Sequence, residues 1–87
     1  MISKSYWLYI IQSKNDGGYY IGITNNLKRR IKQHNAGKTK STKAKRPWKL
    51  VYSEKFESLK EAARREKEIK SWKNTGNFLK SIGELAP

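Results

Sequence analysis

The chain contains no cysteine in 87 residues, so neither a disulfide framework nor a thiolate zinc site can hold its fold together. A chain of this length has room for one modest hydrophobic core. Its aromatic residues (Trp 3, Tyr 5, Phe 2) are sufficient for such a core, and its single histidine excludes a histidine-rich metal cluster. We therefore predict one domain over residues 1–87, held together by side-chain packing alone.

Turn and capping signals divide the chain into five main elements. Strands are predicted over 6–12, 19–23 and 48–56, where aromatic and β-branched residues gather. Helices are predicted over 27–35, from 59 to about 72 and, as an optional addition, over 78–85. The fold class is therefore α/β (α+β): a small three-stranded, antiparallel sheet flanked by helices, in the order β-β-α-β-α(-α), with its motif-bearing core at about 6–72.

Local residue chemistry sets the element boundaries. Asn15-Asp16-Gly17-Gly18 favours a hairpin turn, because Asp-Gly and Gly-Gly accept positive φ. Thr24-Asn25-Asn26 caps the first helix and Gly37 closes it, whereas Ser58-Leu59-Lys60-Glu61 is a capping box that opens the second. Residues 38–47 are predicted to be a polar, lysine-rich loop.

Two helices place polar groups where apolar ones are expected. At 100° per residue, Arg30 and His34 fall in the same sector as the apolar stripe of the first helix. In the second helix Glu66 lies near the centre of a face that its apolar residues define, namely Leu59, Ala62, Ala63 and Ile69. A buried carboxylate must be paired, protonated or bound to a metal. For Glu66, an ion pair with Arg30 and a metal site are both open alternatives. Taken alone, the first helix favours an Arg30 that extends to solvent and an ordinary edge histidine at His34.

The hairpin contributes two tyrosines and a glycine. If its turn has two or four residues, Tyr9 and Tyr20 share one face of the sheet, because side chains alternate with period two. Gly22 lies inside the second strand, where glycine marks a bulge or the close approach of backbone or ligand. Taken alone, these features favour ordinary strand packing for both tyrosines.

The positive charge is concentrated in the middle of the chain. The net charge is +13, no acidic residue occurs from Gly17 to Ser53, and ten basic residues lie between Lys28 and Lys49. This distribution favours a nucleic acid, because each phosphate contact releases a counterion. A solubilising surface is the alternative; a membrane surface is disfavoured, because the 38–46 segment has no apolar stripe. The lack of cysteine, signal peptide and transmembrane segment predicts a cytoplasmic protein.

The spacing of the polar residues resembles the core motif of the GIY-YIG nuclease family. The residues that carry the resemblance are Trp7-Leu8-Tyr9, Tyr20-Ile21-Gly22, Arg30, His34 and Glu66 followed by Ile69-Lys70. The surrounding segments, including 23–27, 34–37 and 45–52, look like the short stand-alone members and like the catalytic subunit of structure-specific junction endonucleases. The resemblance covers about residues 6–70, although the literal Gly-Ile-Tyr triplet is Trp7-Leu8-Tyr9 here.

The resemblance implies an endonuclease that hydrolyses DNA, including branched or damaged DNA, with DNA repair as its cellular context. It implies that Glu66 binds Mg²⁺ (or Mn²⁺), that Arg30 contacts the phosphate and that Tyr9 is the general base, with a pKa lowered by Arg30 and the metal. Tyr20 and His34 would then position the water or the phosphate. Residues expected to contact the substrate are Gly22, Lys38, Lys40, Lys43, Lys45 and Arg46.

Several alternatives remain at this point. The chain could be a catalytically idle module that binds DNA or RNA, an RNA-associated protein, or a subunit whose protein partner supplies substrate selection. Trp48 could stack on a base or lie in the core. Asn74 and Asn77 are both candidates for the asparagine that many family members carry near the site.

Overall fold

The computed structural model describes residues 5–71 and residue 79. The elements within that part of the chain are β1 (Tyr6–Ser13), β2 (Tyr19–Thr24), α1 (Leu27–Asn35), α2 (Lys40–Lys43), β3 (Trp48–Phe56) and α3 (Leu59–Ser71). The predicted fold class and element order are confirmed. The predicted 38–47 loop differs, because it contains the single helical turn α2. Apart from Leu79, the optional helix at 78–85 lies outside the described residues, as do Asn74 and Asn77.

The three strands form one antiparallel sheet in the order β2-β1-β3. Ser13 N donates to Gly18 O over 2.8 Å, so four residues separate the last paired residues of the hairpin. Tyr9 therefore lies opposite Gly22, and Tyr20 lies opposite the residue two positions after Tyr9. Because the turn is even, the two tyrosines share one face of the sheet, as predicted.

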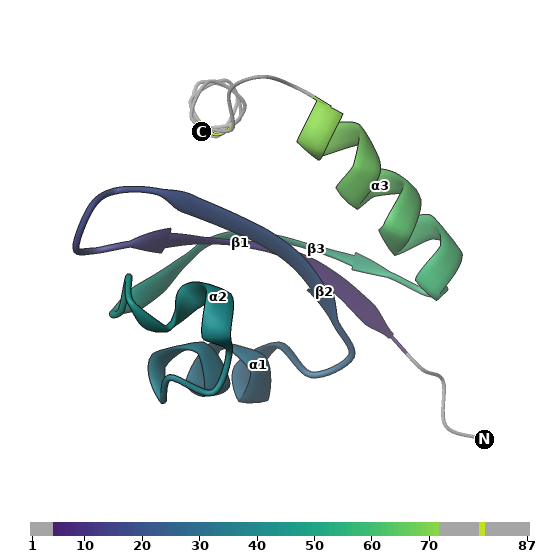
Figure 1. Ribbon diagram of the computed structural model, residues 1–87. Helices are drawn as coiled ribbons and strands as arrows, with labels where there is room; N and C mark the ends of the chain where they lie inside the picture. The colour runs from purple at the N-terminus through teal and green to yellow at the C-terminus, as the bar shows by residue number, and fades with distance from the viewer. Residues whose placement is uncertain (1–4, 72–78, 80–87) are drawn as a thin grey trace, which may run out of the picture.

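Helices cover both faces of the sheet (Figure 1). On the α3 face, Leu8 and Ile10 of β1 pack with Ile21 and Ile69. On the other face, Tyr9, Ile11 and Trp48 pack against side chains of β2 and α1. Successive residues of β1 thus serve opposite layers, which is the period of two that a central strand imposes. None of the helices in the described ranges is long and apolar enough to cross a bilayer.

Both ends of α1 are fixed by local hydrogen bonds. The Asn26 side chain accepts from Arg29 N at 3.0 Å. At the other end, Gly37 has a φ of +78°, and the N–H groups of Gly37 and Lys38 donate back to His34 O and Gln33 O, the pattern of a Schellman cap. These caps confirm the predicted helix and hold Arg30 and His34 at fixed heights above the sheet.

The apolar face predicted for α3 is only partly correct. Ala62 and Ile69 are buried, whereas Leu59 (53% exposed) and Ala63 lie at the surface. Residues 62 and 69 are almost in line along the helix, and the 100° advance per residue turns residue 63 away from them. Glu66 lies about 40° from that line and is half-buried at the border between core and solvent.

Candidate active site

A chain of hydrogen bonds crosses the α1 face of the sheet. Arg30 Nε donates to Tyr9 Oη over 3.3 Å, and Tyr9 Oη lies 2.9 Å from His34 Nε2. His34 Nδ1 lies 2.8 Å from Thr42 Oγ1, which in turn is 3.4 Å from Thr39 O. We call Arg30, Tyr9, His34 and Thr42 the polar chain. Tyr9, His34 and Thr42 are at most 1% exposed, so only Arg30 connects the polar chain to solvent.

Gly22 makes room for the Tyr9 phenol. A Cβ at position 22 would lie 2.5 Å from Tyr9 Oη and 2.7 Å from Tyr9 Cζ. Gly22 is directly paired with Tyr9, and the β1–β2 register continues through it without a bulge. The close approach that a strand glycine indicates is therefore made by a side chain of the protein itself, and the expected substrate contact of Gly22 stays a prediction.

Gly22→Ala is expected to displace the Tyr9 ring and lower the free energy of unfolding by about 1–3 kcal/mol, the usual cost of overpacking a filled site. The midpoint of urea unfolding measures this change. Gly18→Ala is the matched control, because its Cβ would meet the exposed Asp16 carboxylate at 3.0 Å rather than a buried ring. Equal stability of the two variants would show that the ring can move at no cost.

Aromatic rings enclose the polar chain. The Tyr20 ring lies edge-on to His34 with centroids 5.1 Å apart, and 6.4 Å from the rings of Tyr9 and Trp48. Trp48 is 4% exposed, so it is a core residue and not a stacking surface. Its Nε1 donates to Thr42 O over 2.9 Å, and the Asn35 side chain holds its backbone with two hydrogen bonds. This packing fixes α2 against the sheet.

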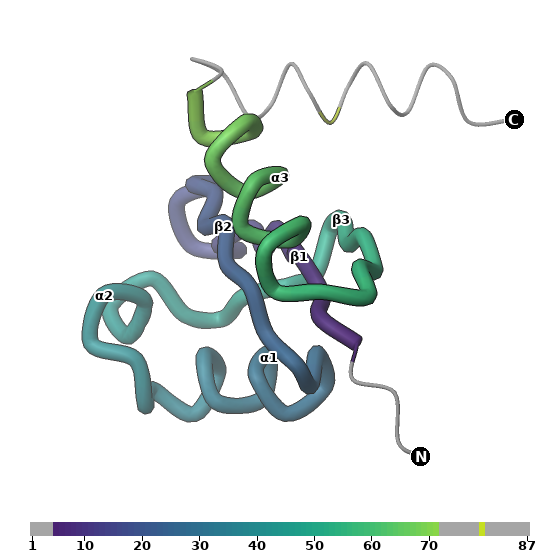
Figure 2. Tube along the Cα trace, turned by 90° about the vertical axis from the view of Figure 1, so that its right-hand side faces the viewer, coloured from purple at the N-terminus to yellow at the C-terminus, as the bar shows by residue number. Residues whose placement is uncertain are grey.

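Glu66 approaches the polar chain from the other layer. In Figure 2, β2 runs between α3 above and α1 below. The Glu66 side chain is 25% exposed and forms an ion pair with Lys70, one turn on, at 3.3 Å. Arg30, the ion-pair partner considered from the sequence, instead donates to Tyr9 and Gln33. The Glu66 carboxylate still acts on the phenol, because its charge helps to raise the pKa of Tyr9.

Burial decides the protonation of Tyr9 and His34. Burial raises the pKa of Tyr9 above 10.0, and it outweighs the lowering effect of the Arg30 hydrogen bond and charge. Arg30 thus acts on this pKa in the expected direction, but without metal or substrate its effect is smaller than that of burial, so the net pKa of Tyr9 is raised and not lowered. Burial, assisted by the Arg30 charge, lowers the pKa of His34 below 6.5. At neutral pH the site thus contains a protonated phenol hydrogen-bonded to a neutral imidazole.

A cleft leads from solvent to Arg30. It has a volume of about 370 Å³ and lies at the β2 edge of the sheet, where α1 and the start of α3 approach each other. Arg29, Arg30 and Gln33 line one wall, and Thr24, Asn25 and Leu59 are on the others. A phosphate in this cleft would meet a guanidinium whose Nε is already oriented by Tyr9, and planar guanidinium groups suit phosphate oxygens.

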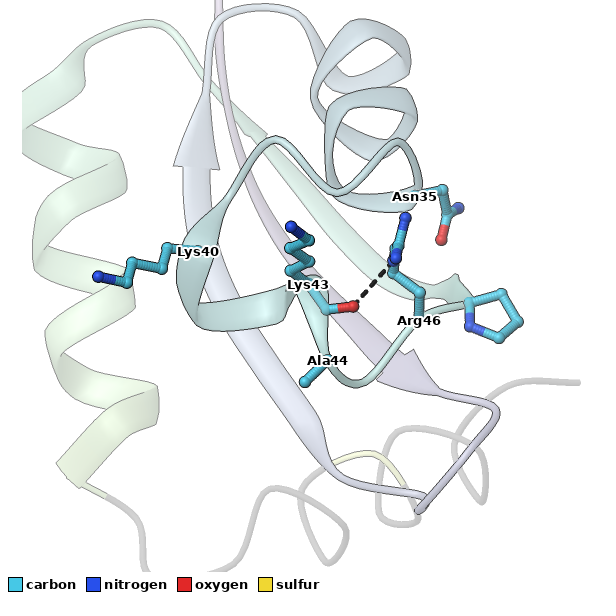
Figure 3. Close-up of a pocket in the computed structure, with 6 residues that line it drawn as sticks. Asn35, Lys40, Lys43, Ala44 and Arg46 are labelled. Atoms are coloured by element: carbon cyan, nitrogen blue, oxygen red, sulfur yellow. Dashed lines mark hydrogen bonds between the residues drawn. The ribbon is translucent and has the colours of Figure 1, made fainter.

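A second hollow lies beside α2 and is basic. Lys40, Lys43 and Arg46 line it together with Asn35. Figure 3 shows the Arg46 guanidinium directed back toward Lys43, whose carbonyl accepts from Arg46 Nε over 2.8 Å, while Lys40 points away. The other two predicted phosphate ligands, Lys38 and Lys45, are exposed but do not line this hollow. Lys45 instead forms an ion pair with Asp16 at 3.5 Å.

The structure thus brings together four of the five residues predicted to be catalytic. Tyr9, Tyr20, Arg30 and His34 lie on one face, and Glu66 is linked to them through its charge alone. Thr42 and Asn35 also belong to the site, although no role was predicted for either. Asn35 ends the predicted helix and lies in the 34–37 segment that resembles the family, and Thr42 lies in the predicted loop, so no local signal showed that either contacts the site.

A three-stranded antiparallel sheet with paired tyrosines, an arginine and a histidine on α1 and a carboxylate on α3 defines a known class of catalytic domain. The profile of the GIY-YIG catalytic domain matches residues 5–80, and the chain belongs to this family. The domain implies nuclease activity, and its members are generally endonucleases that usually use divalent metal ions.

Within the family, the chain is similar to the short UPF0213 proteins. UPF0213 protein SH2523 of Staphylococcus haemolyticus is 50% identical over 68 residues, which span 77% of this chain and 82% of that protein. UPF0213 protein SAG0778 of Streptococcus agalactiae is 45% identical over 67 residues, which span 76% of this chain and 75% of that protein. The solution NMR structure of UPF0213 protein BH0048 from Bacillus halodurans matches with a TM-score of 0.56 at 35% identity and covers 93% of this chain and 84% of that one.

Proposed function

We propose that this protein is an endonuclease that hydrolyses phosphodiester bonds in DNA, including branched or damaged DNA, with the help of one divalent metal ion. The observation that carries the proposal is the hydrogen-bonded series Arg30–Tyr9–His34 at the end of a solvent-open cleft. A group that orients phosphate and a group that accepts a proton are thereby adjacent. A protein that only binds nucleic acid has no need for a phenol and an imidazole joined in this way.

The residues present suit a hydrated Mg²⁺ (or Mn²⁺) ion. In the described ranges no group of three or more His, Cys, Asp or Glu could enclose a metal, which disfavours a tightly coordinated ion such as zinc. Mg²⁺ binds through one or two carboxylates and keeps several waters, and Glu66 would be its protein ligand once Lys70 is displaced. When bound, the ion would polarise the scissile phosphate and stabilise charge on the leaving oxygen.

The protein's own groups account for the proton transfers. Tyr9 is protonated in the resting site, so it acts as a base only if its own proton leaves. His34 Nε2 lies 2.9 Å from Tyr9 Oη and is neutral, because its pKa is lowered. Because Tyr9 is buried and only Arg30 of the polar chain reaches the cleft, the attacking water would enter beside Arg30. It would pass its proton to Tyr9 Oη as the Tyr9 proton moves to His34 Nε2. Such positioned acid–base groups contribute about 10²–10⁴-fold to a rate.

The basic residues supply binding. Arg30 holds oxygens of the scissile phosphate, and Lys40, Lys43 and Arg46 hold phosphates that flank it. These three cations lie in the segment from 17 to 53, which contains no acidic residue that could neutralise them. Tyr20 shields the imidazole from solvent through its edge-on contact.

The experiment that tests the proposal is cleavage of labelled DNA with and without Mg²⁺. Single-stranded, duplex, flap and four-way-junction DNA are compared with RNA of matched sequence. Cleavage of at least one DNA substrate that depends on the metal is expected. Binding of every substrate without cleavage of any would leave the second candidate, a nucleic-acid-binding module, which the charge of +13 favours by itself. Cleavage that appears only with a cell extract would identify a partner-dependent subunit.

Replacing Lys40, Lys43 and Arg46 by alanine is expected to weaken DNA binding and to flatten its salt dependence, by about 0.9 in slope for each phosphate that is no longer neutralised. Fluorescence anisotropy across a salt series measures both quantities. The matched control removes three exposed cations from α3, namely Lys60, Arg64 and Lys67, and so lowers the net charge equally. The same change in both triple variants would mean that the charge acts without a defined site.

A further inference from the structure

Thr42 is a buried hydroxyl in an otherwise exposed, basic segment. It is 1% exposed, whereas its neighbours Ser41 and Lys43 are at the surface. Its backbone is held separately from its side chain: Thr42 N donates to Thr39 O over 3.1 Å, and Thr42 O accepts from Trp48 Nε1. The hydroxyl is thus available to His34 Nδ1, which lies 2.8 Å away.

The groups at the two ends of the polar chain determine its direction, that is, which group donates and which accepts in each hydrogen bond. The Arg30 guanidinium can only donate, so Tyr9 Oη accepts from it. The Tyr9 hydroxyl hydrogen then needs an acceptor, and His34 Nε2 is the group within hydrogen-bonding distance. Nε2 must therefore lack a proton, and the neutral ring carries its proton on Nδ1. At the other end, the Thr39 carbonyl can only accept, so the Thr42 hydroxyl donates to it.

The opposite direction would leave a group unsatisfied. With a proton on Nε2, Tyr9 Oη would face two donors, and its own hydrogen would have no acceptor among its contacts. A buried donor without a partner costs about 1–3 kcal/mol. In the first direction every donor and acceptor of the polar chain has a complementary partner among the contacts described above.

We propose that Thr42 is a positioning residue of the nuclease site: its hydroxyl accepts the Nδ1 proton of His34 and so keeps Nε2 free to receive the Tyr9 proton. The catalytic part of this inference rests on the proposed function, whereas the tautomer assignment does not. Thr42 touches neither substrate nor reacting atoms and acts through the imidazole, as residues behind metal-bound histidines do.

The single histidine of the chain makes the tautomer directly measurable. In full-length protein labelled with ¹⁵N-histidine, both observed ring nitrogens belong to His34. Spectra at about pH 8, where the ring is neutral, are expected to show a protonated Nδ1 and an unprotonated Nε2. A wild-type spectrum with the proton on Nε2 would overturn the proposal without any variant.

Three proteins complete the test. Thr42→Val keeps the shape and removes the hydroxyl, so the proton is expected to move wholly or partly to Nε2 and cleavage to fall roughly 10- to 100-fold, part of the ~10²–10⁴-fold that a positioned base supplies. Thr42→Ser restores the hydroxyl and is expected to keep both the wild-type tautomer and a rate within about threefold. Ser41→Ala changes the exposed neighbour and should alter neither.

Each outcome has one meaning. Retention of the Nδ1 proton in Thr42→Val, or its loss in Thr42→Ser, contradicts the proposal. If Thr42→Val does not fold, the wild-type and Thr42→Ser spectra still decide it. If the wild-type protein cleaves nothing yet shows the expected tautomer and its dependence on the hydroxyl, the proposed function fails and the role of Thr42 in fixing the imidazole stands.

Discussion

Replacing Glu66 by alanine is expected to reduce DNA cleavage by at least about 10³-fold, because a bound metal ion is worth several kcal/mol of transition-state stabilisation. Affinity for DNA should stay near the wild-type value or rise slightly, since the substitution removes a negative charge beside phosphate. Stability should change little: the side chain is 25% exposed, and its partner Lys70 is 54% exposed, so the ion pair contributes weakly. Single-turnover cleavage, anisotropy and thermal unfolding separate these three quantities.

Two controls sharpen this prediction. Glu66→Gln keeps the size and removes the charge, and it should be almost as inactive if the carboxylate binds metal. Glu61→Ala removes another acidic residue from α3, and that residue is exposed, so its rate should equal that of the wild type. Full activity of Glu66→Ala would remove the metal assignment, whatever the behaviour of the other two variants.

Tyr9→Phe is expected to lower the cleavage rate by about 10²–10⁴-fold, the usual contribution of a positioned base. The change also leaves His34 Nε2 without its hydrogen-bond donor in a fully buried place. An unpaired buried group costs about 1–3 kcal/mol, so the free energy of unfolding should fall by that amount. Rates measured below the unfolding temperature, together with urea titrations, distinguish an effect on the chemical step from an effect on stability.

Tyr19→Phe provides the comparison, because Tyr19 neighbours Tyr20 on β2 but is 39% exposed. It should leave both the rate and the stability unchanged. A Tyr9→Phe variant that cleaves at the wild-type rate would show that the phenol is not the base. In that case His34, which would then face the phenyl ring, could not be receiving a proton from it either.

Local signals predicted the strands and α1 well because each signal acts over a few residues. The even hairpin turn fixed which face Tyr9 and Tyr20 share, and Asn26 and Gly37 set the ends of α1. The turn α2 was missed because its residues, Lys40-Ser41-Thr42-Lys43, have no apolar periodicity. It is held by contacts of Thr42 with His34 and Trp48, and such distant contacts have no local sequence signature.

The site was predicted less completely than the fold. The motif spacing correctly brought Tyr9, Arg30 and His34 together, but it contained no information on the burial that outweighs Arg30 and raises the pKa of Tyr9. That burial follows from the packing of both tyrosines and of α1. The assignment of Glu66 to the centre of an apolar face failed for a similar reason, since the rotation of α3 on the sheet is set by Ala62 and Ile69.

The alternation along β1 has a consequence for how this chain can change. Leu8 and Ile10 belong to one layer, and Tyr9 belongs to the other. Substitutions that repack the hydrophobic layer of Leu8 and Ile10 can therefore occur without changing the layer that contains Tyr9. A one-residue insertion or deletion within this central strand is different: it would exchange the two sets of side chains across the sheet and remove hydrophobic core and reactive phenol in one event. Length variation among homologues is therefore expected in the connections, with β1 itself conserved in length.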